Sequence, residues 1–595
     1  MSWTDLLLWL LTGTVLLCIG VVIAWWTHRR RIAAREAKRA QHTVSGSRDM
    51  LGQREIAVRQ MTREDRIVFG CLVDVASEPV MTDRLVMDDT DAPVEVLGAP
   101  GSGKSIAALS PAIVRHRGPA LVSTTKTDLA RGTIGARAIT TAPVIFDPAA
   151  DLAKSPALRD QVRVWTPITE GVTWARAQRT SHAMLTAVKG AEQGGQQAFF
   201  VTHSTIVVAA LLVYLRARPG SSLLDLIKQV KKLGGNNSGA DDGPDAWDSL
   251  LHDLEAEQAN YADAAELGED AAVTMSAALE QAQLALGLTA AAARAEETRA
   301  GILGSVAQVI EGLILAGSVV RQSWDDKTTL RLDTMPEMHT LYLICPTPDY
   351  RPLTNALLGA YVEELQRRAS AHGGALPVQH LVVLDELVHC TPHRDLQSWA
   401  ANLARSARVK FLLCTQSVSD LIGVYGREGA ASIRNACSGG HVLFAATTDS
   451  ETLRAYSELA GKRELVQEQS VSISVTKSNN YSGAVKGMLR DGSSTSKTTQ
   501  RSRNLVEKDA ATPARLAAMQ TFHALVWLPG RPDVPGGTVQ VRATPLFEDP
   551  DLMAAAQGDR AALARVQRLP DTSAWETASP GPRLVEEEDE LGEAA

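Results

Sequence analysis

Residues 98–105 read Gly98-Ala99-Pro100-Gly101-Ser102-Gly103-Lys104-Ser105, and no other segment says as much about the fold. They fit the P-loop pattern GxxxxGK[ST] at every fixed position. A short apolar run at residues 94–97 precedes them, and a run suited to a helix follows at 106–109. The glycines let backbone N–H groups surround phosphates at the amino end of a helix. The pattern therefore predicts a nucleotide-binding loop that uses all eight residues.

The two last residues of the loop have side chains suited to a triphosphate and its metal ion. Lys104 can reach the β- and γ-phosphates, and the Ser105 hydroxyl can ligate Mg²⁺. We therefore expect ATP and Mg²⁺ as cofactors, with Lys104 also catalytic. A chance glycine-rich turn is the alternative, and the strand and helix on either side argue against it.

A second apolar run, residues 381–384, ends in the carboxylates Asp385 and Glu386. Such a pair is weak evidence alone, but after a complete P-loop it predicts a Walker B strand. Asp385 would hold Mg²⁺, directly or through water. Glu386 would act as general base toward the attacking water.

Gln416 ends a third apolar run, residues 410–414 followed by Thr415. A glutamine at the carboxyl end of a strand beside the P-loop strand can sense the γ-phosphate or position water. The alternative is an ordinary polar residue at a strand-to-loop junction.

Short apolar runs alternate with helical stretches along much of the chain, which predicts a buried, mainly parallel sheet in an α/β fold. The runs are residues 94–97, 120–122, 144–146, 340–345, 380–384, 410–414, 441–445 and 522–528. Residues 180–322 break this rhythm, and their Ala, Leu, Glu and Gln predict an all-α insertion. The expected parts are an anchor and linker (1–50), the first part of the P-loop domain (51–179), the insertion (180–322), the second part of the P-loop domain (323–548) and an acidic, disordered tail (549–595).

Residues 6–26 carry no charge and are long enough, at 1.5 Å per residue, to cross a bilayer. Arg29, Arg30 and Arg31 follow them, and only Asp5 precedes them. The positive-inside rule predicts a single-pass helix in the cell (plasma or inner) membrane, with the amino terminus outside and the bulk of the chain in the cytoplasm. No later segment is expected to span.

The 595 residues carry a net charge of -8, which argues against a generally basic surface but leaves room for a local basic patch. Residues 470–503 form such a patch in a Ser/Thr-rich stretch that predicts a long loop or a strand pair with a mobile tip. Its basic residues are Lys477, Lys486, Arg490, Lys497, Arg501 and Arg503, against Asp491 alone. They could follow a phosphate backbone, or they could belong to a merely solvated loop.

An ordered series of motifs resembles the type IV coupling proteins, the TraG/TraD-like ATPases of conjugation and type IV secretion. The resemblance covers about residues 93–545, and its most specific part follows the P-loop. That part comprises Leu384-Asp385-Glu386-Leu387, Asp395-Leu396, Trp399, Thr415-Gln416-Ser417, Tyr425-Gly426, Asn435 and Cys437. Phe146-Asp147-Pro148 and Thr166-Pro167 are also similar to family blocks.

The resemblance implies a RecA-like P-loop motor domain with an inserted all-α domain and a homo-hexameric ring with a central channel. It implies that ATP hydrolysis drives single-stranded DNA, with its attached relaxase, into a type IV secretion channel. Ring motors of this kind use an arginine finger from the neighbouring subunit. Arg405 is the candidate by its position, and Arg408 and Arg434 are alternatives. The other possibility is that Arg405 merely forms an ion pair at the surface. Family members often have two or more membrane helices, whereas one is expected here.

Two other functions remain as alternatives, of which the first fits the motifs equally well and the second less well. A motor for protein substrates would share every motif named above. A non-hydrolysing membrane adaptor that docks substrates on another motor would have no need of Lys104, Ser105, Asp385 and Glu386 together.

Overall fold

The computed structural model describes residues 67–73, 80–88, 90–189, 196–234, 245–266, 269–479, 493–530 and 536–568. The expected membrane helix at 6–26 and the basic linker at 28–50 lie outside these residues. The chain divides into two compact units, and among the described residues the smaller one is 460–511.

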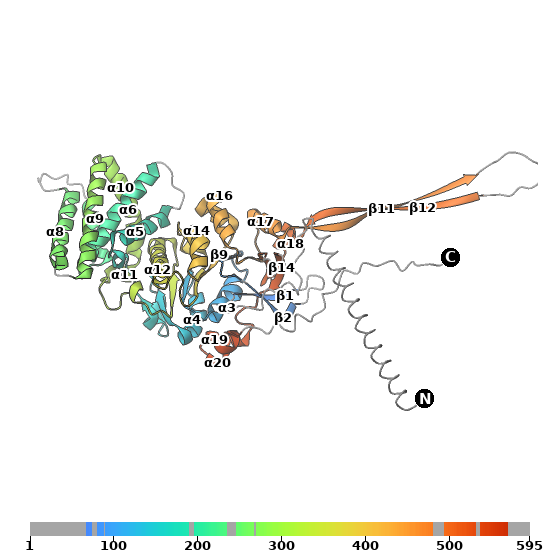
Figure 1. Ribbon diagram of the computed structural model, residues 1–595, viewed down its shortest axis with the longest axis horizontal. Coiled ribbons are helices and arrows are strands. Elements are labelled where there is room, and N and C mark those ends of the chain that lie inside the picture. Colours follow the sequence, from blue (N-terminus) through green and yellow to red (C-terminus); the bar gives the residue numbers. More distant parts are fainter. Residues whose placement is uncertain are drawn as a thin grey trace, which may run out of the picture. The chain divides into compact units, whose positions relative to one another are not determined.

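The larger unit is built on a twelve-stranded mixed sheet (Figure 1). In sheet order the strands are β2 (Val80–Met87), β1 (Val68–Val73), β14 (Gly537–Arg542), β13 (His523–Leu528), β10 (Gly440–Phe444), β3 (Val94–Leu97), β9 (Val409–Thr415), β8 (His380–Leu384), β4 (Ala120–Thr124), β7 (His339–Ile344), β5 (Ala142–Phe146) and β6 (Val162–Arg163).

All eight predicted apolar runs fall in strands of this sheet, and no run extends beyond its strand by more than one residue. The strands from β10 to β6 run parallel, as predicted for continuous apolar segments buried on both faces. The sheet also continues beyond β10 through β13, β14, β1 and β2, and these pairings are antiparallel. That antiparallel extension was not predicted.

Alternate residues of the central strands enter two different hydrophobic cores. On β8, Leu381 and Val383 join one core, whereas Val382 and Leu384 join the other. The first core is covered by the π-helical turn η1 (Ser105–Leu109) with α3 (Ser110–Arg115), and by α4 (Asp128–Thr140). The second is covered by α12 (Arg351–Ala371) and α16 (Val418–Ala436). The sheet thus lies between two layers of helices, and this packing on both faces holds the carboxyl ends of its strands in place.

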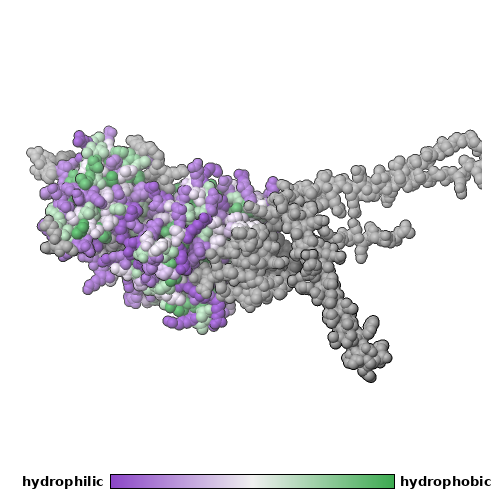
Figure 2. Space-filling model, in the orientation of Figure 1, coloured by the Kyte–Doolittle hydropathy of each residue, from purple (hydrophilic) through white to green (hydrophobic). Residues whose placement is uncertain are grey.

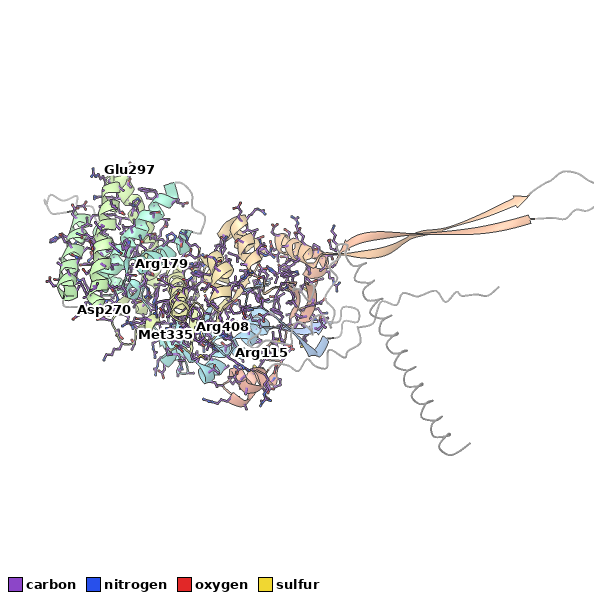
Figure 3. All side chains as sticks on the ribbon, in the orientation of Figure 1. Arg115, Arg179, Asp270, Glu297, Met335 and Arg408 are labelled. Carbon is purple, nitrogen blue, oxygen red and sulfur yellow. The ribbon has the colours of Figure 1, made fainter. Side chains whose placement is uncertain are left out.

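Every described element between β6 and β7 is helical. These elements include α5 (Trp174–Lys189), α6 (Gln196–Arg216), α7 (Leu223–Gly234), α8 (Ala246–Glu266), α9 (Asp270–Ala292), α10 (Glu296–Leu315) and α11 (Gly317–Arg321), with short 3₁₀ turns η4 (Pro167–Glu170) before them and η5 (Leu332–Thr334) after them. Asp270 and Glu297, near the starts of α9 and α10, lie at opposite ends of this helical region in Figure 3. Its core is continuous with that of the sheet face under α12. The domain boundaries at 180 and 322 stay a prediction.

Two helices of this region, α6 and α10, are long and apolar enough to pass a test for a membrane span by length and composition. The expectation that no later segment would qualify was therefore too strict. In α6, however, Val207 to Leu215 are all buried against neighbouring helices. This burial is that of a core helix, and it accounts for the apolar composition.

Some apolar side chains of the helical region face outward. Figure 2 shows hydrophobic residues gathered over part of its surface. The exposed ones on α9 and α10 are Val273, Leu284, Leu288, Ile314 and Leu315.

The smaller unit contains a long antiparallel hairpin, β11 (Lys462–Asn479) and β12 (Ser493–Asp509). Its register runs from Lys462 opposite Asp509 to Asn479 opposite Ser493, with one irregularity between Gln469 and Ser472. The strand-pair form expected for residues 470–503 is therefore confirmed. Its tip, residues 480–492, lies outside the described residues.

The expectation of a disordered tail from residue 549 is wrong for its first part, because α19 (Pro550–Ala556) and α20 (Arg560–Val566) are helices packed on α3 and α4. Asp549 and Asp559 cap their amino ends by accepting backbone N–H hydrogens. Leu552, Leu563 and nearby alanines then supply the buried face. The acidic run at 586–590 lies outside the described residues.

The remaining short elements connect these layers. They are η2 (Leu152–Lys154), η3 (Arg159–Gln161), η6 (Pro348–Tyr350), α13 (Leu387–Cys390), α14 (Leu396–Ser398), η7 (Trp399–Leu403), α15 (Ala404–Ser406), α17 (Ser450–Ala460) and α18 (Pro513–Ala517).

Candidate nucleotide site

The P-loop connects the carboxyl end of β3 to η1, as the sequence predicts. Gly101 and Gly103 have φ angles of 80° and 93°, which favour glycine. A Cβ on Gly98 would lie 2.7 Å from Ser102 Oγ and 2.8 Å from Phe444 Cβ, so a side chain there would clash. Ser102 Oγ is buried and has no hydrogen-bond partner among the described residues. The loop is thus closely wrapped, with a free polar atom inside it.

Lys104 is buried within this loop. Its Nζ donates to the carbonyl oxygen of Gly98 across 2.9 Å. The bond folds the side chain back over the loop that begins at Gly98. Ser105 starts η1, and its carbonyl accepts the backbone N–H of Ser110, which closes the wider π-type turn.

Asp385 follows β8 directly and is buried. Its backbone N–H donates to the Ser123 carbonyl, and its Oδ2 accepts the Thr124 hydroxyl across 3.1 Å. Oδ1 has no hydrogen-bond partner in the part of the chain that the structure describes. A buried carboxylate oxygen without a donor is costly, and a bound cation would satisfy it.

Burial raises the pKa of the Asp385 carboxyl above its ordinary value, and the Glu386 carboxylate adds to the rise. The Lys104 ammonium and the Thr124 hydroxyl oppose it. The ammonium is therefore close enough to act on Asp385, which brings the P-loop and the Walker B strand into one site.

Glu386 occupies the left-handed backbone region, with φ 48° and ψ 45°, at the start of α13. For a residue with a Cβ this conformation is strained, and such strain is concentrated at functional sites. The Glu386 side chain is half-buried, and its Oε2 accepts the Thr125 hydroxyl across 2.8 Å. Its carboxylate is thus held at the edge of the sheet beside Asp385.

Gln416 lies at the same edge, because Thr415 on β9 pairs in parallel with Leu97 on β3. The next residues of the two strands are Gln416 and Gly98. Strand β9 is also paired with β8, where Leu413 lies opposite Leu384. The P-loop, Gln416 and Asp385 therefore leave three adjacent strands at their carboxyl ends, where α/β folds bind ligands.

The candidate arginine fingers lie elsewhere. Arg405 is exposed on α15, and its Nη2 donates to Ser438 Oγ across 3.1 Å. Both residues precede the amino ends of their strands, β9 and β10, whereas the P-loop follows a carboxyl end. The seven residues of β9 span about 23 Å, so Arg405 is not brought to the P-loop of its own subunit.

The two alternative arginines have structural partners. Arg408 donates to the Pro377 carbonyl across 2.8 Å, also at the amino edge of the sheet, where Figure 3 labels it. Arg434 forms an ion pair of 2.9 Å with Glu95 in the P-loop strand. Burial alone would raise the pKa of Glu95, but Arg434 and His441 outweigh it and lower that pKa to about 2. Arg434 is thus committed to the core of its own subunit.

Sequence reasoning missed Thr124 and Thr125, which hydrogen-bond the carboxylates of Asp385 and Glu386. The available signal was two polar residues at the end of a predicted parallel strand.

Comparison with known proteins supports the same family as the motifs. Residues 379–521 match a family model described as the TraM recognition site of TraD and TraG. No curated protein sequence matches the chain.

Comparison with solved structures shows which known fold the chain shares. The chain is similar to plasmid coupling protein TrwB in complex with the non-hydrolysable ATP analogue ADPNP, with a TM-score of 0.50 at 15% identity over 84% of this chain and 94% of that one. TrwB in complex with ADP and Mg²⁺ gives the same values. At this identity the likeness establishes a shared fold. Residues 379–521 in addition match the family model of TraD and TraG.

Proposed function

We propose that the chain is a membrane-anchored, hexameric ATPase that couples ATP hydrolysis to transfer of single-stranded DNA, with bound relaxase, into a type IV secretion channel. The observation that carries the ATPase part is the buried, unpartnered Asp385 Oδ1 close to the P-loop lysine. The family match of residues 379–521 supports the transfer part.

The residues at the sheet edge fit ATP with Mg²⁺. The N–H groups of residues 98–105 would hold the phosphates, and the Ser105 hydroxyl with Asp385 Oδ1 would hold the metal ion. When bound, Mg²⁺ neutralises charge on the phosphate oxygens. Plasmid coupling protein TrwB has been solved with ADP and Mg²⁺, in agreement with this assignment.

The chain's own side chains would then divide the work of hydrolysis. Lys104 exchanges its bond to the Gly98 carbonyl for one to a phosphate oxygen. Glu386 accepts a proton from the attacking water at its carboxylate, and Thr125 holds that carboxylate in place. Gln416 contacts the γ-phosphate or the water from the neighbouring strand.

A ring accounts for the position of Arg405. It is exposed at the amino edge of the sheet, far from its own P-loop, so it would serve the site of a neighbouring subunit. In that arrangement each site is complete only in the assembled hexamer.

The DNA and membrane parts rest on sequence. Basic residues are concentrated in 470–503, and such a segment suits a phosphate backbone. The uncharged stretch 6–26 with its basic flank would anchor the chain in the cell membrane. The family description also names TraM recognition, which makes residues 379–521 the candidate region for a partner of the DNA-processing complex.

The test is ATP turnover by the full-length protein in detergent, alone and with single-stranded or duplex DNA. We expect turnover that single-stranded DNA stimulates and that Lys104→Ala abolishes while leaving thermal unfolding unchanged. If ATP turnover were unchanged by DNA but increased with a secreted protein substrate, the protein-substrate motor would replace the DNA-transfer function. Absence of turnover by the wild type would remove the ATPase assignment.

A further inference from the structure

Two phenylalanines lie beside the P-loop without a part in the chemistry above. A Cβ built on Gly103 would lie 2.4 Å from Cδ1 of Phe522, so the Phe522 ring lies directly against the loop. Phe522 and Phe547 form an edge-to-face pair with ring centroids 6.2 Å apart. Both belong to the larger unit of the chain.

The antiparallel extension of the sheet brings these residues to the nucleotide edge. Strand β13 pairs with β10 so that Ala524 lies opposite Phe444, at the carboxyl end of β10. Strand β14 returns to that edge, where Arg542 lies opposite His523. The backbone N–H of Leu546 then donates to the Ile106 carbonyl across 3.0 Å, which fixes Phe547 next to the helix that follows the P-loop.

The two residues differ in burial, because Phe522 is partly buried against the core of the sheet whereas Phe547 is exposed. Phe522 has a φ of 66°, a strained value for a residue with a Cβ. Phe547 is 56% exposed, and Ile106 beside it is 37% exposed. An exposed apolar patch next to a polar phosphate loop contributes little to folding, whereas a flat ligand would cover it.

We propose that Phe547, supported by Phe522 and Ile106, stacks against the purine base of the nucleotide whose phosphates occupy the P-loop. This inference rests on the proposed nucleotide binding and extends it to a base subsite. Stacking reads the face of a base rather than its hydrogen-bonding edge. The subsite should therefore accept adenine and guanine with similar affinity.

The experiment measures equilibrium binding by calorimetry with MgADP, MgGDP and tripolyphosphate, which has phosphates but no base. Phe547→Ala should weaken both nucleotides by about tenfold, while tripolyphosphate binding stays within about twofold. Phe547→Tyr keeps the ring and should bind like the wild type. Phe547→Leu keeps an apolar side chain without the ring and should resemble Phe547→Ala.

Leu288→Ala is the matched control, because it removes an apolar side chain that is 74% exposed on α9. It should change none of the affinities. Unchanged nucleotide binding in Phe547→Ala, or an equal loss for tripolyphosphate, would overturn the base subsite while leaving the ATPase proposal in place. A base-dependent loss in a protein without ATP turnover would support the subsite and remove the ATPase proposal. Failure of the wild type to bind MgADP would overturn both.

Discussion

Thr125, after the end of β4, donates its hydroxyl hydrogen to Oε2 of Glu386, after the end of β8, across 2.8 Å. The two strands are adjacent and parallel, so their following residues meet at one edge. This bond orients a carboxylate whose backbone is already in the left-handed region. We therefore propose that Thr125 positions Glu386, the proposed general base.

The first prediction concerns this pair. Thr125→Val removes the donor with little change in shape, and we expect ATP turnover to fall about tenfold with ATP affinity unchanged. Glu386→Gln should lower turnover about 100-fold or more while still binding ATP, because an amide cannot accept the proton. Turnover and nucleotide binding measured side by side check both.

Thr125→Ser is the control, because it keeps the hydroxyl and should restore most of the turnover. If Thr125→Val were as active as the wild type, Thr125 would have no positioning role. Normal turnover in Glu386→Gln would remove Glu386 as the base.

Asp385→Asn should stabilise the protein while it abolishes turnover. The pKa of Asp385 is raised in the folded state, so the folded protein holds this proton more tightly than the unfolded chain does. Its contribution to stability is present below the unfolded pKa and is lost as pH rises through the folded pKa. At neutral pH without Mg²⁺ the neutral amide removes that penalty, and the unfolding temperature should rise.

Thermal unfolding with EDTA, from pH 5 to 8, tests this sign. The gain over the wild type should be larger at the high end of that range. A lower unfolding temperature for Asp385→Asn in EDTA at pH 8 would contradict the prediction. Excess Mg²⁺ and ATP should stabilise only the wild type.

Arg405 should act on a neighbour's nucleotide. Arg405→Ala is expected to bind ATP normally and hydrolyse it poorly. Mixed with Lys104→Ala subunits it should regain turnover, because some intact P-loops then face an intact arginine. Turnover is measured in particles shown to contain both subunits.

Arg427→Ala is the matched control, since Arg427 is an exposed arginine on α16 that pairs with Glu451. It should hydrolyse ATP normally without mixing. Arg434→Ala should instead lower the unfolding temperature, because it leaves Glu95 buried without its main cation. No recovery in mixed particles would count against Arg405 as a finger supplied in trans.

The basic hairpin segment should set the salt dependence of DNA binding. Neutralising Lys486, Arg490 and Lys497 together should reduce the slope of log affinity against log salt for single-stranded DNA by about 2. Fluorescence anisotropy with a labelled oligonucleotide over a salt series gives that slope. Replacing Lys228, Lys231 and Lys232 of α7 by glutamine removes equal charge and should leave it unchanged. Equal slopes for the wild type and the hairpin variant would reduce the segment to a solvated hairpin.

The predicted membrane helix at residues 6–26 determines which side of the membrane each part of the chain should lie on. A reporter fused after Arg39 should behave as cytoplasmic, and one fused at the amino terminus as external, because positive charge follows residues 6–26. Paired alkaline phosphatase and fluorescent-protein fusions distinguish the two sides. An external location for the bulk of the chain would contradict both the topology and the ATPase proposal.

Patterns that are local in sequence predicted much of the sheet and of the nucleotide site. The P-loop is one contiguous segment, and the Walker B carboxylates follow a strand whose burial on both faces makes it apolar throughout. The bond from Thr125 to Glu386 joins residues 261 positions apart, and no local pattern encodes it. Phe522 begins a predicted apolar run, but its position beside the P-loop and that of Phe547 could not be predicted, because β13 pairs antiparallel with β10 and β14 pairs antiparallel with β13.

The carboxyl-terminal segment from residue 549 shows a different error, because order was present where disorder was predicted. An acidic run at 586–590 led to one assignment for all residues from 549 on, although Asp549 and Asp559 are good capping residues before apolar turns. Composition averaged over a long segment concealed two short helices. Arg405 lies at the amino edge of the sheet, so the role proposed for it depends on a neighbouring subunit, which no sequence pattern within one chain describes.

The core shared by the sheet and the helical region has a mechanical consequence. Apolar side chains from β8, α12, α6 and α10 form one continuous packed cluster. Packed interiors deform little, so a hinge there would have to open many close contacts. We therefore expect the helical region and the sheet to move together as one rigid body. In the proposed ring, movement is therefore expected between neighbouring subunits rather than within this shared core.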